Sequence, residues 1–87
     1  MQVSVYDTYV TRTDGSVMHF DILVPTSLTN QATIHGYGQT YLATKGQAGQ
    51  PLTARECRFC HIEQATESIQ NSIANQGFYI IEMQGCL

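Results

Sequence analysis

Alternation marks the stretch VMHFDILV at positions 17–24, where Met18, Phe20, Ile22 and Val24 point one way and His19 and Asp21 the other. Successive side chains of a strand point to opposite faces, so His19 and Asp21 would share one face while the other is wholly apolar. Pro25 has no N–H to donate to strand pairing, and we expect it to end the strand. The pattern predicts a strand with one buried face and one polar face.

A second stretch, QVSVYDTYV at positions 2–10, is rich in Val, Thr and Tyr, which favour strands. Between the two stretches lies Asp14-Gly15, a typical hairpin turn when strands flank it. The sequence therefore predicts an antiparallel hairpin over residues 2–24.

The next segment, residues 26–46, predicts a helix. Ser27 or Thr29 would cap its start, Lys45 suits its last turn, and Gly46 would cap its end. Its apolar stripe would consist of Ile34, Tyr37, Tyr41 and Leu42. Two glycines in the stretch IHGYGQ each cost about 1 kcal/mol relative to alanine. The helix therefore either packs closely against another element there or is irregular.

Three further elements follow a loop at 47–51. Residues 52–59 predict a third strand, with Cys57 and Phe59 on one face and Glu56 and Arg58 on the other. Residues 66–77 predict a short helix with Thr66 as N-cap and Gly77 as its end. Residues 78–85 predict a last strand, interior to the sheet because its first half is apolar on both faces.

The element order is therefore β-β-α-β-α-β in a single α+β domain spanning residues 1–87. Because strand–helix–strand crossovers are right-handed, we expect both helices on one face of a mixed four-stranded sheet. The other sheet face would then be open to solvent or to a partner.

Composition narrows the classes of partner. The formal net charge is −3 and only four Lys and Arg residues are scattered along the chain, which argues against a nucleic-acid partner. No stretch is apolar enough to span a bilayer, and the chain opens without a signal-peptide pattern. We expect a cytoplasmic protein with reduced thiols. Charged residues make up 13% of the chain, against about 25% in typical domains, so self-repulsion is weak and homo-oligomers are expected to be tolerated.

Four stretches together, VYDTYV, MHFDILVP, ECRFCH and GFYIIEMQGC, resemble a small bacterial family known as domain of unknown function twenty-twenty-four. The resemblance covers most of the chain and is loosest over residues 28–52. It implies an α+β domain with two helices on a sheet, and it implies no activity.

The stretch ECRFCH at positions 56–61 contains the one short motif with recognisable chemistry. A Cys-x-x-Cys-His pattern holds haem in c-type cytochromes. That use requires an oxidising compartment, an attachment machinery and a second axial ligand, none of which the sequence signals. The sequence therefore argues against haem c.

Zinc fits the motif better, because a Cys-x-x-Cys pair is the usual half of a structural site. Cys57 and Cys60 would need further ligands from His61, Cys86 or His19. In a regular strand, however, positions three apart face opposite ways. The two thiols converge only if the chain turns between them.

Two other interpretations of the motif remain. A thiol-redox pair needs its reactive cysteine at a helix N-terminus, but the predicted helix begins near Thr66, several residues too late. The interpretation we favour is packing, with Cys57 as a small buried residue and Cys60 and His61 in a turn.

A second group of candidates lies on the open sheet face. His19, Asp21 and Glu82, with Tyr6 and Arg58 beside them, could support general acid–base chemistry, because histidine titrates near neutrality. An antiparallel sheet with one solvated face carries polar residues there in any case. We therefore predict a binding or assembly module that can form homo-oligomers through this face; the sequence identifies no small-molecule ligand. The alternatives are a zinc or thiol site at Cys57, Cys60 and His61, or a small enzyme using His19 and Asp21.

Overall fold

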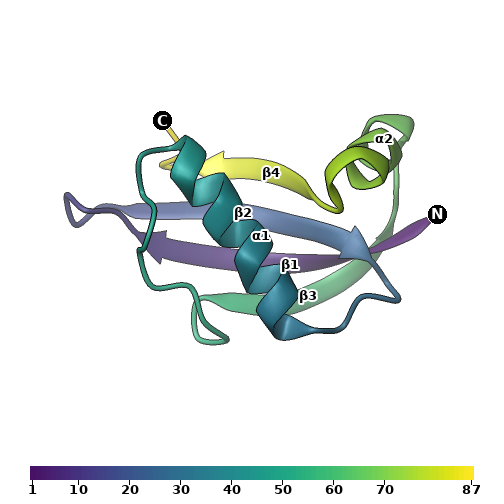
Figure 1. Cartoon of the computed structure of the whole chain (residues 1–87), viewed down its shortest axis with the longest axis horizontal. Helices are drawn as coiled ribbons and strands as arrows, with labels where there is room; N and C mark the ends of the chain where they lie inside the picture. The colour runs from purple at the N-terminus through teal and green to yellow at the C-terminus, as the bar shows by residue number, and fades with distance from the viewer.

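The computed structural model describes all residues 1–87 and contains four strands and two helices in the predicted order β-β-α-β-α-β (Figure 1). The elements are β1 (Gln2–Thr11), β2 (Val17–Pro25), α1 (Gln31–Thr44), β3 (Cys57–Gln64), α2 (Glu67–Gln76) and β4 (Tyr79–Gln84). Neither helix is long and apolar enough to cross a membrane.

The sheet has the strand order β3-β1-β2-β4, and every neighbouring pair is antiparallel. The prediction of a mixed sheet was therefore wrong. The α1 crossover does connect strands that run the same way, β2 and β3, but β1 lies between them. The prediction of an interior last strand was also wrong, because β4 is an edge strand.

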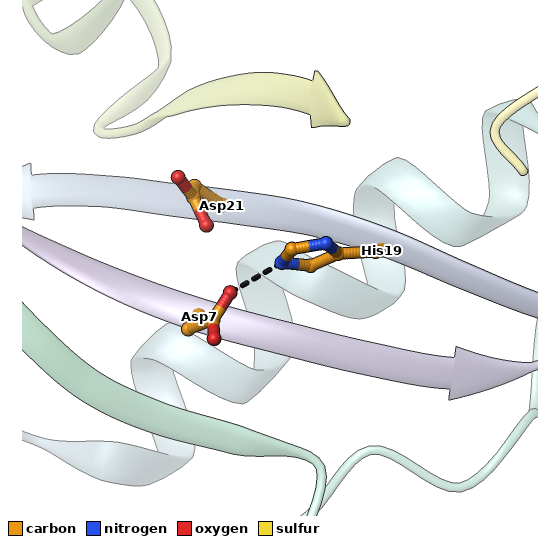
Figure 2. Close-up of side chains that lie close together, drawn as sticks. All are labelled: Asp7, His19 and Asp21. Carbon is orange, nitrogen blue, oxygen red and sulfur yellow. Dashed lines mark hydrogen bonds and ion pairs between the residues drawn. The ribbon is translucent and has the colours of Figure 1, made fainter. Parts of the chain in front are cut away.

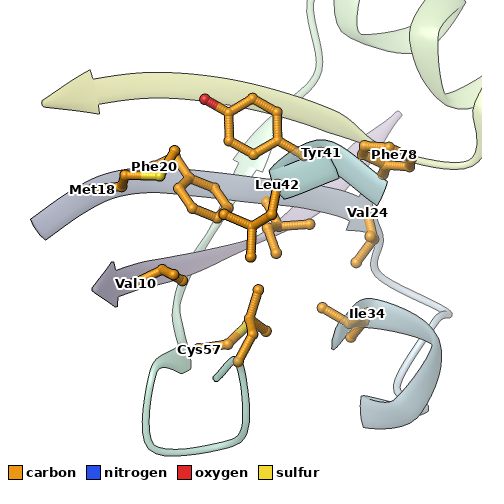
Figure 3. Packing of buried hydrophobic residues seen from close by; sticks show 11 residues of the cluster. Val10, Met18, Phe20, Val24, Ile34, Tyr41, Leu42, Cys57 and Phe78 are labelled. Carbon is orange, nitrogen blue, oxygen red and sulfur yellow. The ribbon is translucent and has the colours of Figure 1, made fainter. Parts of the chain in front are cut away.

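The two helices cover opposite faces of the sheet, which corrects the prediction that both lie on one face. Figure 1 shows α1 crossing in front of the sheet and α2 near the end at which β4 begins. Under α1 lies a core of 11 buried residues, including Met18 and Phe20 of β2 (Figure 3). Under α2 lies a second, smaller core that includes Val3, Val5 and Leu23. These residues alternate along β1 and β2 with those under α1, so they face the other way.

The helices on both faces also explain the composition of β4. Ile80 packs against the core under α1, whereas Tyr79 and Ile81 pack against the core under α2. The strand is apolar on both faces because each face is covered by a different helix. Its position in the sheet plays no part in this pattern.

The β1–β2 hairpin is regular throughout its length, with Thr11 opposite Val17 and Val3 opposite Pro25. Its loop is closed by a hydrogen bond from the Arg12 N–H to the Ser16 carbonyl, 2.7 Å. Gly15 adopts a φ of 88° there, a left-handed conformation that glycine accepts readily. The predicted hairpin is confirmed.

Helix α1 begins later than predicted. Asn30 is its N-cap, and the Asn30 side chain accepts a hydrogen bond from the Thr33 N–H at 3.0 Å; Ser27 and Thr29 lie outside the helix. Gly38 explains part of the irregular stretch IHGYGQ, since an added Cβ would lie 2.4 Å from Leu52 Cδ1. The helix therefore packs closely against the segment before β3. Of the two alternatives predicted for this stretch, close packing or irregularity, the structure shows close packing at Gly38.

The third strand starts at Cys57 and continues to Gln64, so the prediction of a strand over 52–59 was wrong at both ends. Residues before Cys57 form a turn, in which the Glu56 carboxylate accepts hydrogen bonds from the N–H and hydroxyl of Thr53. Helix α2 has the predicted N-cap, Thr66, and ends at Gly77 with a φ of 94°.

Candidate functional site

Three polar side chains meet on the face of the sheet that α1 does not cover. Figure 2 shows Asp7 of β1 beside His19 and Asp21 of β2. Asp7 and Asp21 are direct partners in the hairpin register, and His19 precedes Asp21 by two residues, which places all three on one face. One potential ligand atom from each lies within 4.8 Å of the others. We call this group the Asp7–His19–Asp21 cluster.

The imidazole of His19 is held in a defined orientation. Its Nε2 lies 2.5 Å from Oδ1 of Asp7. The ring stacks on Tyr9, with ring centroids 4.1 Å apart and planes inclined by 11°; Tyr9 is also the register partner of His19. The His19 and Asp7 side chains are 20% and 35% exposed. A half-buried ring with a fixed plane and a carboxylate partner is preorganised for chemistry at its nitrogens.

Electrostatics within the cluster are unfavourable for one carboxylate. Partial burial is the main cause that raises the pKa of Asp21, and the negative charge of Asp7 raises it further. His19 and His61 act in the opposite direction and lower the pKa of Asp21 more weakly. Two carboxylates held together in this way would be stabilised by an added positive charge.

The sequence placed His19 and Asp21 on one open face, and the structure brings these two together. The sequence-based prediction did not include Asp7, which completes the cluster. The signal for Asp7 was the hairpin register, because residues whose numbers sum to 28 are partners along the entire hairpin.

The other residues predicted for this face do not belong to the cluster. Glu82 lies on the α1 face, where its carboxylate accepts a hydrogen bond from the Tyr41 hydroxyl at 2.5 Å and pairs with Lys45 at 2.7 Å. Tyr6 also packs against the core under α1. Arg58 is the register partner of Asp7 on β3.

The structure spreads the residues of the Cys-x-x-Cys-His motif over different environments. Cys57 is buried in the core under α1, and this burial raises the pKa of its thiol. Cys60 is exposed at a bulge, where β3 has one residue more than β1. The His61 Nε2 lies 2.6 Å from Oε1 of Glu63. Cys86 is half-buried beside β2, and its thiol donates to the His19 carbonyl at 3.4 Å. None of these four residues joins a group of three potential ligands.

Two cavities, of about 320 and 270 Å³, lie away from the cluster. Both are lined in part by residues of α1. The first lies between α1 and β3, and the second between α1, the C-terminal half of α2 and the start of β4. No residue of the cluster lines either cavity.

Comparison with known proteins agrees with the fold and identifies the family. Residues 1–83 match the family described as "Domain of unknown function (DUF2024)". The chain belongs to this family. The resemblance noted in the sequence is thereby confirmed. Among solved structures, this DUF2024 protein is similar to the NMR structure of protein NE1680 from Nitrosomonas europaea, with 38% sequence identity, a TM-score of 0.85 and complete coverage of both chains. No curated protein matches the chain.

Proposed function

We propose that this DUF2024 protein is a binding module whose ligand is a divalent metal ion, held on the sheet face opposite α1 by Asp7, His19 and Asp21. The observation that supports the proposal most directly is the convergence of three ligand atoms within 4.8 Å. Sheet pairing fixes the backbone positions of all three residues, so little conformational entropy is lost when an ion binds.

The donor set suits a particular group of metals. One imidazole nitrogen and two carboxylate oxygens are ligands for Zn²⁺, Mn²⁺ and Fe²⁺, with the remaining coordination positions left to water or to a small ligand. Mg²⁺ and Ca²⁺ prefer oxygen donors alone, which makes His19 a basis for discrimination. The proposal therefore favours first-row transition ions over the alkaline-earth ions.

The location of the cluster also favours an ion over an organic substrate. Both cavities are lined by α1 residues, whereas the cluster lies on the face that α1 does not cover. Enzymes usually enclose their substrate in a pocket beside the catalytic groups. An ion needs only the three side chains, so the small enzyme using His19 and Asp21 has less support.

Binding would be linked to pH. His19 Nε2 is hydrogen-bonded to Asp7, and a metal ion held by both side chains would replace this hydrogen bond. Metal ligands must be deprotonated, because protons compete with the ion for the same atoms, so the affinity should rise with pH.

Isothermal titration of tag-free, chelator-treated protein with Zn²⁺, Mn²⁺ and Mg²⁺ tests the proposal. We expect about one Zn²⁺ or Mn²⁺ per chain, weaker binding of Mg²⁺, and a loss of at least about tenfold in affinity in His19→Ala and in Asp21→Asn. Glu67→Gln, which changes an exposed carboxylate at the start of α2, outside the cluster, is the matched control.

A variant lacking the two motif thiols, Cys57→Ala/Cys60→Ala, distinguishes the competing site. Zn²⁺ binding that disappears in this variant but persists in His19→Ala would contradict the proposal and favour a thiolate site. The proposal would also be contradicted if none of the three ions bound at millimolar concentration.

A further inference from the structure

Strand β3 forms one edge of the sheet and pairs only with β1. Its outer side presents unpaired backbone N–H and C=O groups, which are a template for another strand. Soluble proteins protect such edges with Lys, Pro, other charged residues or β-bulges; β3, CRFCHIEQ, has no Lys or Pro, but it contains Arg58, Glu63 and one bulge. Two of its apolar side chains are also more than half exposed: Phe59 at 54% and Ile62 at 52%.

A bulge in β3 brings these two apolar side chains to the same face. Phe59 pairs with Tyr6 and Ile62 with Ser4 on β1, and Cys60 is the extra residue between them. Tyr6 and Ser4 are two residues apart on a regular strand, so their partners share the face that α1 covers. By the same register Arg58, opposite Asp7, and Glu63, opposite Val3, share the other face.

The orientation of the backbone is consistent with an outward-facing set of hydrogen-bonding groups. At one end of β3 the Glu56 carbonyl accepts from Tyr9 N–H, and at the other the Ala65 N–H donates to the Met1 carbonyl. Both groups therefore point toward β1. Backbone groups of successive residues in a strand point alternately toward and away from the neighbouring strand. Counting from Glu56 at one end and from Ala65 at the other, the N–H and C=O groups of Phe59 and Ile62 point away from β1.

We propose that two copies of this chain pair through β3, antiparallel about a two-fold axis between Cys60 and His61, to form one continuous eight-stranded sheet. In this register Phe59 lies opposite the partner's Ile62, and Arg58 lies opposite the partner's Glu63. Outward backbone groups then meet outward groups, apolar side chains meet on one face, and opposite charges meet on the other.

The charges favour this register over its neighbours. Arg58 makes no ion pair within its own chain, so its guanidinium is available to a partner. Glu63 contacts His61 of its own chain through Oε1 alone, so its carboxylate would have to contact both His61 and the partner's Arg58. A shift by one residue would bring side chains of opposite faces together and separate both pairs. Two-fold symmetry makes each contact twice, which strengthens both the apolar and the charged match.

Sedimentation velocity over 1 µM to 1 mM protein, combined with charge reversal, tests the dimer. We expect a concentration-dependent dimer that Arg58→Glu or Glu63→Arg weakens at least about tenfold, because like charges then face each other twice. The double variant Arg58→Glu/Glu63→Arg should restore the dimer. Phe59→Lys should also weaken it, while Met83→Lys, at an equally exposed position on the other edge strand, should not.

Cross-linking supplies an independent readout of the register. A short bismaleimide should join two wild-type chains through Cys60, which lies next to the axis, and Cys60→Ser should remove the product. Circular dichroism of each variant confirms that it is folded. A monomer at every concentration, or a dimer indifferent to all β3 variants, would overturn the proposal.

Discussion

Asp7 and Asp21 are direct partners across the β1–β2 hairpin, so two carboxylates face each other on the side of the sheet opposite α1. Like charges directly opposite in a sheet are destabilising. His19 hydrogen-bonds only Asp7 and compensates the pair only in part, because the pKa of Asp21 remains raised. Unfavourable local electrostatics of this kind is typical of functional sites.

The raised pKa of Asp21 has a consequence for stability. A carboxyl group whose pKa is higher in the folded than in the unfolded protein makes stability fall as pH rises through that interval. Asp21→Asn should therefore be more stable than wild type at pH 7 without metal, with the difference shrinking below the ordinary pKa of 3.8. Urea denaturation at pH 3 and pH 7 measures this.

Asp14 is the control for that measurement. Hydrogen bonds from Ser16 lower the pKa of Asp14, which is the reverse situation. Asp14→Asn should be less stable than wild type at pH 7, and this loss should vanish in acid. Destabilisation of both variants at pH 7 would show that the Asp7–Asp21 contact is favourable.

The two glycines of α1 form a matched pair. An added Cβ at Gly36 meets nothing within 4 Å, whereas at Gly38 it would collide with Leu52 Cδ1. Gly36→Ala should gain about 0.5–1 kcal/mol from helix propensity. Gly38→Ala should be about 1–2 kcal/mol less stable than Gly36→Ala, because Leu52 must repack. Equal thermal stabilities would show that Leu52 moves at no cost.

The three residues of the Cys-x-x-Cys-His motif should differ in their effect on stability. Cys57 is 5% exposed, so Cys57→Ala should leave a small cavity and cost about 1–2 kcal/mol. Cys60→Ala and His61→Ala should each change stability by less than about 0.5 kcal/mol in dilute protein, because both are exposed. Equal, large losses at both cysteines that a chelator reproduces in wild type would instead indicate a thiolate metal site.

Tyr41 anchors α1 to β4 through Glu82. Lys45, followed by Tyr41, lowers the pKa of Glu82, so this interaction stabilises the fold above the unfolded pKa of the carboxyl group and is lost as the pH falls through its folded pKa. Tyr41→Phe should cost about 1 kcal/mol at pH 7 and less at pH 3. A loss of the same size at both pH values would mean that packing, and not the hydrogen bond, is affected.

Much of the hairpin was predictable from alternation, but the residue opposite Asp7 depends on the length of the turn. A two-residue turn at Asp14-Gly15 would place Asp7 opposite Ile22. The actual loop has three residues, closed between Arg12 and Ser16, and this moves Asp7 opposite Asp21. Matching Val10 with Met18 on the apolar face would have selected the correct register.

The arrangement of the helices also left a trace in the sequence. In β1 the buried valines change face: Val3 and Val5 lie under α2, whereas Val10 lies under α1. Leu23 interrupts the polar face of β2 for the same reason. These exceptions to alternation indicate that part of the polar face is also covered by a helix. The rule of right-handed crossovers had placed both helices on the other face. Strand propensity did not locate the start of β3, because the buried residue Leu52 lies in the irregular segment before the strand.

The thermal stability of wild type and Asp21→Asn, each with and without Zn²⁺, tests the account of the cluster most directly. Without metal, Asp21→Asn should melt at the higher temperature at pH 7. A ligand at 100 times its dissociation constant adds about 2.7 kcal/mol, roughly 10–20 °C for a domain of this size, so Zn²⁺ should reverse the order. A metal-induced shift equal in the two proteins, or none in wild type, would contradict a metal site at Asp7, His19 and Asp21.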